Sequence, residues 1–383
     1  MNNNQSTPAA IPATTTATQD EKWMRAALAQ SQIGQGWTSP RPSVGCVIVR
    51  EGQIIGAAHT TPGDGNPHAE VGALKRAVEA DQSTQGATAY VTLEPCSHFA
   101  TTPPCTKALI EAGITRVVAG VRDPNPEVNG RGYEQLREAG IEVVQDFMSD
   151  ECARMHDQFL KQIVLHTPFV TLKCAASLDG KIALASGESR WITNKDSRRR
   201  AHILRHEHDA VLVGIETVLS DDPQLNVRLE GNWKQPARVV LDSRGRIPLH
   251  SRLLQDGSTP VFIATTNAMP KETKAALESR GAQVLVCGDD ERVDWRKLLS
   301  ALYENKIYSV LIEGGASVAS SALQKKVVDK VAWFVAPILI GAGREALAEY
   351  STPLLSDAPR LRKVQSERVG DDTLITGYLN STS

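Results

Sequence analysis

The sequence lacks an apolar segment long enough to cross a bilayer. Its longest strongly apolar run, Val331–Ile340, contains a proline and has about half the length that a membrane-spanning helix needs. It also lacks a charge imbalance, since 42 Lys and Arg stand against 44 Asp and Glu, for a net charge of -2. This excludes the electrostatic footprint of a protein that binds nucleic acid or an anionic membrane. We therefore expect small-molecule substrates, and neither nucleic acid nor membrane as a partner.

Three further absences narrow the class of protein. Residues 1–19 lack a basic start and an apolar core, so we expect a disordered tail and not a signal peptide. Cysteines are few, six in all, which fits a reducing cytoplasm. No G-x-G-x-x-G motif follows a predicted strand, which excludes an ordinary Rossmann site. At 383 residues the chain exceeds one usual core, and we predict two domains, 20–166 and 167–383.

A metal-binding pattern is present in the first half: His68-Ala69-Glu70, then Pro95-Cys96, then Cys105. Zinc held by three protein ligands keeps one position for water, whose pKa falls from about 16 toward about 7. Glu70 lies two residues after His68, where it can shuttle a proton. The order is typical of zinc nucleobase deaminases, although their common signature has two residues between the cysteines and this chain has eight. We predict Zn2+ at His68, Cys96 and Cys105, with Glu70 as general acid and base.

Two other interpretations of this pattern remain open. His98 lies two residues after Cys96 and could complete a closed structural zinc site. Structural sites usually pair their ligands at close spacing and leave no carboxylate beside the first ligand, which favours catalysis. A deaminase that acts on polynucleotides is the second alternative, but the balanced charge and the cysteine spacing disfavour it.

Helices and strands alternate along both halves, which predicts α/β domains. Asp20 can cap a helix from about Glu21 to Gly34. The other elements predicted in the first half are strands Val44–Val49 and Ile54–Ala58 in a hairpin, a helix over 68–80, strand Ala89–Leu93, helix Thr106–Ala112, strands Thr115–Val121 and Ile141–Val144, and a helix over 150–164. Both cysteine ligands then lie at helix starts, where the helix dipole favours thiolates.

The second half is predicted to form a second α/β domain. Its predicted elements are strands Phe169–Ala175, Ala210–Gly214, Ala237–Asp242, Val261–Thr265, Val284–Cys287, Val310–Glu313, Val331–Ile340 and Thr373–Leu379, with helices over 194–206 and 271–280. Val331–Ile340 is either a buried core strand or an element of a subunit interface.

Several motifs resemble the bifunctional riboflavin-biosynthesis deaminase–reductases. The first half has Val44–Val49 (VGCVIV), Thr92–His98 (TLEPCSH) and Thr102–Cys105 (TPPC). The second half has the motifs of the reductase domain in the order that the family has them: Lys173–Lys181 (KCAASLDGK), Ser186–Thr193 (SGESRWIT), Thr217–Pro223 (TVLSDDP) and Glu313–Gly315 (EGG). The resemblance covers nearly everything from residue 21 onward.

The resemblance implies two consecutive reactions in a cytoplasmic enzyme. A cytidine-deaminase-like α/β/α domain would hydrolytically deaminate 2,5-diamino-6-(5-phosphoribosylamino)pyrimidin-4(3H)-one. A dihydrofolate-reductase-like α/β domain would then reduce the ribosyl group of the aminouracil product to ribityl with NADPH. The family also implies a homo-oligomer, either a dimer or a tetramer. The alternative for the second half is a domain that only binds a ligand or stabilises an oligomer.

The resemblance also assigns residues of the second half. The substrate would be bound by Lys173, Ser189, Arg205, Leu225, Arg228 and Glu313. NADPH would be bound by Ala175, Trp191, Thr217, Asp221, Ser243 and Gly315. Arg205 and Arg228 have the planar donor forks that suit a phosphate. Each residue has a structural alternative: Arg205 can be a solvated helix face, Trp191 a core residue, and Gly315 part of a tight turn.

Other polar residues of the second half are assigned structural roles. Thr193 with Asp196 has the spacing of a capping box. Arg198–Arg200 is assigned to a charged helix surface. His202 and His206 lie one helical turn apart, but they lack the glutamate and third ligand of a metal site, so we assign both to the structure.

The chain departs from the family pattern at two places in the first half. Arg41 stands where the family usually has Asn, and Ala100-Thr101 stands where it has Gly-Arg. Arg41 can therefore be the cation that recruits the substrate phosphate in place of the missing arginine at position 101.

Overall fold

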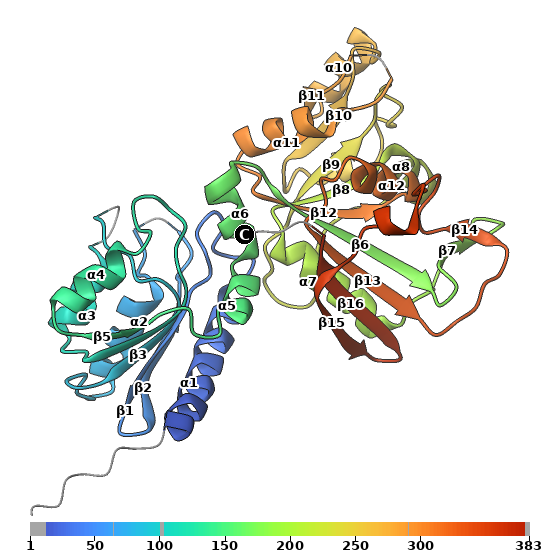
Figure 1. Ribbon diagram of the computed structural model, residues 1–383. Coiled ribbons are helices and arrows are strands. Elements are labelled where there is room, and N and C mark those ends of the chain that lie inside the picture. The colour runs from blue at the N-terminus through green and yellow to red at the C-terminus, as the bar shows by residue number, and fades with distance from the viewer. Residues whose placement is uncertain (1–12, 64, 100–102, 290, 380–383) are drawn as a thin grey trace, which may run out of the picture. The chain divides into compact units, whose positions relative to one another are not determined.

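A computed structural model describes residues 13–63, 65–99, 103–289 and 291–379. The chain divides into two compact units, Met1–Val164 and Leu165–Ser383 (Figure 1). The division falls two residues before the boundary predicted between residues 166 and 167. Among the described helices, none is both long enough and apolar enough to span a membrane.

The N-terminal unit is built on a five-stranded sheet in the order β2-β1-β3-β4-β5. The strands are β1 Gly45–Arg50, β2 Gln53–His59, β3 Thr88–Leu93, β4 Arg116–Val121 and β5 Glu142–Val144. β1 pairs antiparallel with β2 and β3, whereas β3, β4 and β5 run parallel. Glu51 and Gly52 both have positive φ, 51° and 74°, which is the turn that closes a two-residue hairpin. The predicted hairpin is confirmed.

Helices cover both faces of this sheet, which gives the three layers predicted (Figure 1). The helices are α1 Ala13–Gly34, α2 Ala69–Glu79, α3 Cys105–Glu111, α4 Arg131–Glu138, α5 Ser149–Met155 and α6 Asp157–Leu165. Along β1 alternate side chains enter different cores: Cys46 and Ile48 pack with α2, α3 and α4, while Val47 and Val49 pack with α1 and α5. The sheet is therefore buried on both sides.

The C-terminal unit contains a nine-stranded sheet in the order β11-β10-β9-β8-β12-β6-β13-β16-β15. Its strands are β6 Phe169–Ser177, β8 Ala210–Gly214, β9 Ala237–Leu241, β10 Val261–Thr265, β11 Ala282–Val286, β12 Ser309–Gly314, β13 Lys330–Ala336, β15 Arg362–Val369 and β16 Asp372–Tyr378. The strands from β11 to β13 run parallel, and β16 and β15 extend the edge antiparallel. β8 and β10 are buried along their whole length, as expected of central parallel strands.

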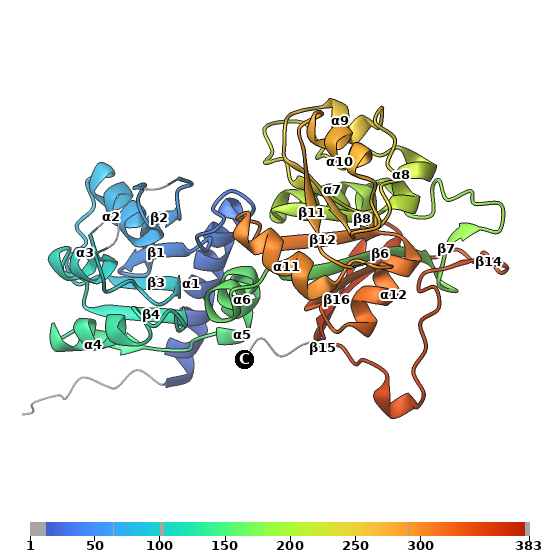
Figure 2. The same cartoon turned by 90° about the horizontal axis from the view of Figure 1, so that it is seen from above.

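Helices also cover both faces of the large sheet, as Figure 2 shows. One face carries α11 Trp295–Glu304 and α12 Ala316–Gln324, and the other carries α7 Lys195–Glu207, α8 Ile215–Asp221, α9 Arg252–Gln255 and α10 Lys271–Glu278. A separate two-stranded sheet joins β7 Lys181–Leu184 to β14 Gly343–Glu345, and a short 3-10 turn covers Leu355–Asp357. The prediction of a second α/β domain is confirmed.

The first helix begins earlier than predicted. α1 starts at Ala13, so residues 13–19 are helical and Asp20 lies inside the helix instead of capping it. The Asp20 carboxylate accepts hydrogen bonds from the Tyr90 hydroxyl at 2.6 Å and from the Arg116 guanidinium at 2.8 and 2.9 Å. Asp20 therefore anchors α1 to the sheet, and an interior ion pair replaces the predicted cap. Residues 1–12 of the predicted tail lie outside the described residues.

Two long elements of the prediction are shorter in the structure. The helix expected over 150–164 is two helices, α5 and α6, separated at His156, whose buried ring Nε2 lies 3.0 Å from Thr92 Oγ1. The strand expected over Val331–Ile340 ends at Ala336, before Pro337. This strand, β13, lies between β6 and β16, which is the position of a core strand.

Candidate active sites

Three side chains of the N-terminal unit form a group that fits a metal ion. His68 is the N-cap of α2, Cys96 follows the end of β3, and Cys105 is the first residue of α3. His68 Nδ1 lies 3.5 Å from Cys96 Sγ and 3.3 Å from Cys105 Sγ, and the three atoms lie within 4.8 Å of one another. Tetrahedral zinc with bonds of about 2.0–2.3 Å requires donors about 3.5 Å apart. The spacing and the donor types therefore fit zinc.

Backbone contacts hold the two sulfur atoms close together. The amide of Cys105 donates to Cys96 Sγ at 3.3 Å, and the amide of Thr106 donates to the Cys96 carbonyl at 3.2 Å. Hydrogen bonds from Cys105 and His68 lower the pKa of the Cys96 thiol to about 4. This favours the thiolate, which is the form that binds metal.

One local prediction about the ligands is wrong, and one alternative gains no support. Cys105 opens a helix as predicted, but Cys96 lies in an irregular segment and not at a helix start. His98 is not part of the ligand group, which among the described residues contains only the three predicted ligands; its Nε2 lies 3.9 Å from a Glu127 carboxylate oxygen instead. The group therefore has the three-ligand composition of an open site.

Glu70 lies in the first turn of α2, two residues after the N-cap His68. Its side chain is buried, with 3% of the residue exposed. Burial raises the pKa of Glu70 to about 7, and the negative charge of Cys96 adds to the rise. A carboxyl group with a pKa near neutrality can both accept and donate a proton at working pH. The Glu70 carboxyl group thus lies beside the ligand Cys105, where its predicted role as proton carrier would place it.

Arg41 contacts the backbone of the loop that precedes the ligand His68. Its guanidinium donates to the Asn66 carbonyl at 3.4 Å and to the carbonyls of Thr61 and Gly63. This loop leads directly into His68. The hydrogen bond with Cys96 raises the pKa of His68, and the Arg41 charge opposes part of this rise. Arg41 therefore braces the loop that precedes a ligand; recruitment of phosphate by Arg41 stays a prediction. Ala100-Thr101, the other departure, lies outside the described residues.

Six of the twelve residues predicted to bind substrate or NADPH lie toward or beyond the carboxyl ends of the parallel strands. Lys173 and Ala175 lie in the last half of β6, and Glu313 near the end of β12, while Thr217, Ser243 and Gly315 follow the ends of β8, β9 and β12. A Cβ atom on Gly314 would lie 3.1 Å from Thr217 Oγ1, so α8 and the end of β12 are neighbours. Ligands of open α/β sheets bind at this edge.

Arg205 and Glu313 form a buried ion pair. Arg205 Nε and Nη2 donate to the two Glu313 carboxylate oxygens at 2.6 and 2.9 Å, and Nη1 donates to the Asn226 carbonyl at 2.8 Å. Burial opposes ionisation of Glu313, but the charge and hydrogen bonds of Arg205, with the charge of Lys173, lower its pKa to about 2. The family resemblance assigns each residue to the substrate separately, whereas in the structure the two residues bind each other.

Other predicted residues occupy different environments. Leu225 is 3% exposed in the core and has a φ of 53°, so its side chain faces the core. Gly315 has a φ of 83° at the start of α12, a conformation that favours glycine. Arg228 is exposed, and its Nη1 donates to the Asn226 side chain at 2.9 Å.

The segment before α7 differs from the prediction in two ways. Trp191 is 68% exposed, with the Arg198 guanidinium 4.3 Å from the ring centroid, so the core interpretation of this tryptophan is wrong. The N-cap of α7 is Asn194 and not Thr193, because the Asn194 side chain accepts from the amides of Asp196 and Ser197. Ser189 precedes this turn, in the segment between β7 and α7.

The two histidines of α7 accept backbone hydrogen bonds. His202 Nδ1 accepts from the Arg228 amide at 3.4 Å, and His206 Nδ1 accepts from the Lys234 amide at 3.1 Å. Burial and the neighbouring charges of Arg205 and Arg228 lower the pKa of His202 to about 4. Both histidines hold loops to α7, in keeping with their structural assignment.

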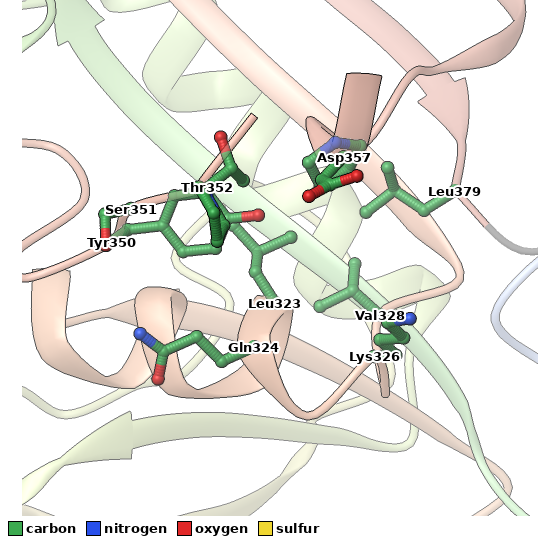
Figure 3. Close-up of a pocket in the computed structure, with 11 residues that line it drawn as sticks. Leu323, Gln324, Lys326, Val328, Tyr350, Ser351, Thr352, Asp357 and Leu379 are labelled. Atoms are coloured by element: carbon green, nitrogen blue, oxygen red, sulfur yellow. The ribbon is translucent and has the colours of Figure 1, made fainter. Parts of the chain in front are cut away.

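A cavity of about 660 Å³ lies elsewhere in the C-terminal unit (Figure 3). Its lining comes from the C-terminal end of α12, the segment before β13, the 350–359 segment and the end of β16: Leu323, Gln324, Lys326, Val328, Tyr350, Ser351, Thr352, Pro353, Asp357, Pro359 and Leu379. Gly315 lies at the opposite end of α12. Within the described part of the chain, none of the residues predicted to bind substrate or NADPH lines this cavity.

Two protein families match the two units. The family described as the cytidine and deoxycytidylate deaminase zinc-binding region matches residues 17–121, and that described as the RibD C-terminal domain matches residues 168–375. The riboflavin biosynthesis protein RibD of Aquifex aeolicus is 40% identical over 356 residues, which cover 93% of this chain and 97% of that protein. RibD of Escherichia coli is 40% identical over 371 residues, which cover 93% and 98%.

Solved structures agree over both units. The Thermotoga maritima protein described as a diaminohydroxyphosphoribosylaminopyrimidine deaminase/5-amino-6-(5-phosphoribosylamino)uracil reductase has a TM-score of 0.82 and 35% identity, and covers 95% of this chain and 100% of its own. Acinetobacter baumannii RibD has a TM-score of 0.80 and 39% identity with the same coverage, 95% and 100%. With a zinc-type deaminase site in one unit and a reductase fold in the other, this chain belongs to the RibD family of bifunctional deaminases and reductases of riboflavin biosynthesis.

Proposed function

We propose that the N-terminal unit converts 2,5-diamino-6-(5-phosphoribosylamino)pyrimidin-4(3H)-one to the corresponding aminouracil, and that the C-terminal unit reduces the ribosyl group of this product with NADPH. The observation that carries the proposal is the group of His68 Nδ1, Cys96 Sγ and Cys105 Sγ within 4.8 Å, beside the buried carboxyl of Glu70. The similarity of the whole chain to RibD proteins supports the order of the two reactions.

In the deamination, His68, Cys96 and Cys105 would hold zinc, which as a Lewis acid would make a water molecule nucleophilic near neutral pH. Glu70 accepts a proton from the water as its oxygen bonds to ring carbon C2, and delivers that proton to the adjacent ring nitrogen. Glu70 then takes the proton of the C2 hydroxyl group and delivers it to the amine, so that the C2 carbonyl forms, the carbon–nitrogen bond breaks and ammonia leaves. The pKa of Glu70, about 7, suits both transfers.

In the reduction, the ribosylamine opens to an imine; bound NADPH would supply the hydride that C1′ accepts, and the imine nitrogen takes up a proton from solvent. Lys173 and Glu313 follow the paired residues Leu172 and Ile312 on neighbouring strands, so we assign both to the ribose. Two guanidinium nitrogens of Arg205 bind Glu313 and orient its carboxylate. We therefore assign the substrate phosphate to the exposed Arg228.

The remaining predicted contacts complete this proposal. The backbone of Leu225 and the hydroxyl of Ser189 contact the substrate. NADPH would be held by Ala175, Trp191, Thr217, Asp221, Ser243 and Gly315, several of which lie at the carboxyl ends of the parallel strands. We further propose that the protein forms a homo-oligomer and is cytoplasmic. None of the six cysteines forms a disulfide, which supports a reducing compartment.

A coupled assay on the purified full chain tests the proposal. Ammonia release from the diaminopyrimidine phosphate, followed by NADPH oxidation that depends on the product, is the expected result. Ammonia release without NADPH oxidation would leave the C-terminal unit as a binding domain only. Elemental analysis should find one zinc per chain in the wild type and none in Cys105→Ser; full zinc occupancy in that variant would remove Cys105 from the site.

A further inference from the structure

Glu94, the residue before Pro95-Cys96, has a buried carboxylate bound by backbone amides. It is 3% exposed. The amide of Gly130 donates to both its oxygens, at 2.8 and 3.0 Å, the amide of Gly132 donates at 3.1 Å, and that of Asp123 at 3.3 Å. These donors all come from residues 123–132, about 30 or more positions later in the chain. Glu94 thus ties the segment that carries Cys96 to a remote part of the chain.

The remote segment is the beginning of α4. Gly130 is the N-cap of this helix and Gly132 is its second residue. Because glycine has no side chain, Gly130 cannot cap the helix with a side-chain hydrogen bond. Free amides and the positive end of the helix dipole favour a carboxylate at this position, which Glu94 supplies from the other segment. Gly132 lies so close that a Cβ atom would be 2.1 Å from the Pro95 carbonyl oxygen. The start of α4 therefore packs directly on the Glu94-Pro95 backbone.

One turn further along α4, Gln135 contacts both cysteine segments. Its side-chain nitrogen donates to the Ser97 carbonyl at 3.3 Å, and its side-chain oxygen accepts from the Thr106 hydroxyl at 2.8 Å. Ser97 follows the ligand Cys96, and Thr106 follows the ligand Cys105. A single amide group thus connects the backbones next to the two sulfur ligands.

We propose that Glu94 and Gln135 are positioning residues, which hold Cys96 and Cys105 at the spacing of a zinc site through α4. Neither residue contacts the substrate in this scheme, and their effect is on metal affinity. Partners behind the ligands of a metal site commonly change its affinity about 10- to 100-fold when they are removed. The inference rests on the zinc site proposed above and adds two residues to it.

The test measures zinc affinity of the full-length enzyme by competition with a chromogenic chelator. Glu94→Gln places an amide N–H against backbone N–H donors, and Gln135→Ala removes the connection between the two cysteine segments; each should weaken zinc binding about 10- to 100-fold. In the cobalt-substituted protein, the thiolate-to-metal charge-transfer band should shift or lose intensity. Glu138→Gln, an exposed change on the same helix, is the matched control and should bind zinc as the wild type does.

NADPH oxidation with supplied aminouracil reports on the C-terminal unit of each variant and should stay unchanged. If Glu94→Gln unfolds the N-terminal unit, the milder Gln135→Ala decides. Wild-type zinc affinity and an unaltered cobalt spectrum in a folded Gln135→Ala and Glu94→Gln would overturn the inference while leaving the zinc site intact. A wild-type enzyme that binds no zinc would instead overturn the proposed function itself.

Discussion

The two active sites are assembled from the chain in different ways. In the N-terminal unit, the three side chains of the ligand group, His68, Cys96 and Cys105, lie within 4.8 Å of one another, and Glu70 lies beside Cys105. In the C-terminal unit, the predicted residues extend from Lys173 to Gly315, and those at the ends of β6, β12, β8 and β9 reach one edge because these parallel strands lie side by side. A metal site needs particular donor atoms, so its residue types identify it. A site for a dinucleotide and a sugar phosphate needs shape and backbone, which residue types indicate poorly.

The two sites also differ in how they treat buried charge. Glu70 has no ion-pair partner in the described part of the chain, and its burial raises its pKa to about 7, ready for proton transfer. Glu313 is held ionised by Arg205, with a pKa of about 2, ready for binding and not for proton transfer. The same type of group thus has a pKa suited to proton transfer in one unit, where we propose that Glu70 is the acid and base, and is a fixed anion in the other.

If Glu70 is the proton carrier, Glu70→Gln should give the largest effect, because a neutral amide cannot accept the proton of water. Ammonia release should fall about 10²- to 10⁴-fold. Zinc content and NADPH oxidation with supplied aminouracil should remain normal. Glu79→Gln, at the exposed end of the same helix, is the control. Unchanged ammonia release in Glu70→Gln would remove Glu70 from the mechanism.

If Glu313 is a fixed anion, removing its partner should cost stability. Arg205→Leu leaves an unpaired buried carboxylate and should destabilise the C-terminal unit by about 3–5 kcal/mol, measured by urea unfolding. Replacing both residues with leucine should recover much of this loss. Equal destabilisation in the single and double variants would mean that the unpaired Glu313 carboxylate is not what destabilises Arg205→Leu.

The same pair predicts a dependence on pH. The folded-state pKa of Glu313, about 2, lies below its ordinary value of 4.5. The stability that ionised Glu313 contributes is therefore complete above about pH 4.5 and is lost as the pH falls toward 2. The urea midpoint of the wild type should fall toward that of the double-leucine variant over this range. A constant difference between the two midpoints would contradict the assignment.

If the two sites share no catalytic group, Lys173→Ala should abolish only the reduction. NADPH oxidation should fall about 100-fold, because a charged contact to the sugar is lost. Ammonia release and zinc content should stay near the wild-type values, and Lys271→Ala, at the exposed start of α10, should change neither activity. Loss of both activities in Lys173→Ala would show that the units are coupled.

The smallest expected effect is that of Arg41→Gln. Loss of its hydrogen bonds to the 61–66 loop should destabilise the N-terminal unit by about 1 kcal/mol. The Michaelis constant of the deamination should change little if Arg41 only braces this loop. A large rise of that constant with unchanged stability would instead make Arg41 a ligand of the substrate phosphate.

The sequence predicted the two α/β domains, most of the strands and the three residues of the ligand group, but not helices α4, α8, α9 and α11 or strands β7, β14 and β15. Buried strands such as β8 and β10 are continuous apolar runs, which stand out from their surroundings. β15 was missed because nearly every residue in it is exposed, so it has no apolar pattern. The sequence predicts a helix cap at Asp20 because Asp is common at that position. Instead, Asp20 lies inside the helix and binds Arg116, 96 residues later in the chain.

The same limit applies to the candidate sites. His68, Cys96 and Cys105 were identified because their chemistry is specific at any distance along the chain. Arg205 was assigned to a phosphate because a sequence does not record that Glu313, 108 residues later, occupies its donor fork. Glu94 belongs to the TLEPCSH motif, but its contacts are with the backbone amides of Gly130 and Gly132 at the start of α4. Glycines have no side chain that could reveal such a contact in the sequence.

The close approach of Gly132 to the Pro95 carbonyl has a consequence for sequence variation. A methyl group at position 132 would lie 2.1 Å from a backbone oxygen that cannot easily move away. Gly132→Ala is one of the mildest substitutions by chemical similarity, but it should rank among the least tolerated in a mutational scan. Charge reversals at the exposed Glu134 and Glu138 should change stability and zinc binding very little. Substitution matrices, which score side-chain similarity, would order these three positions the wrong way round.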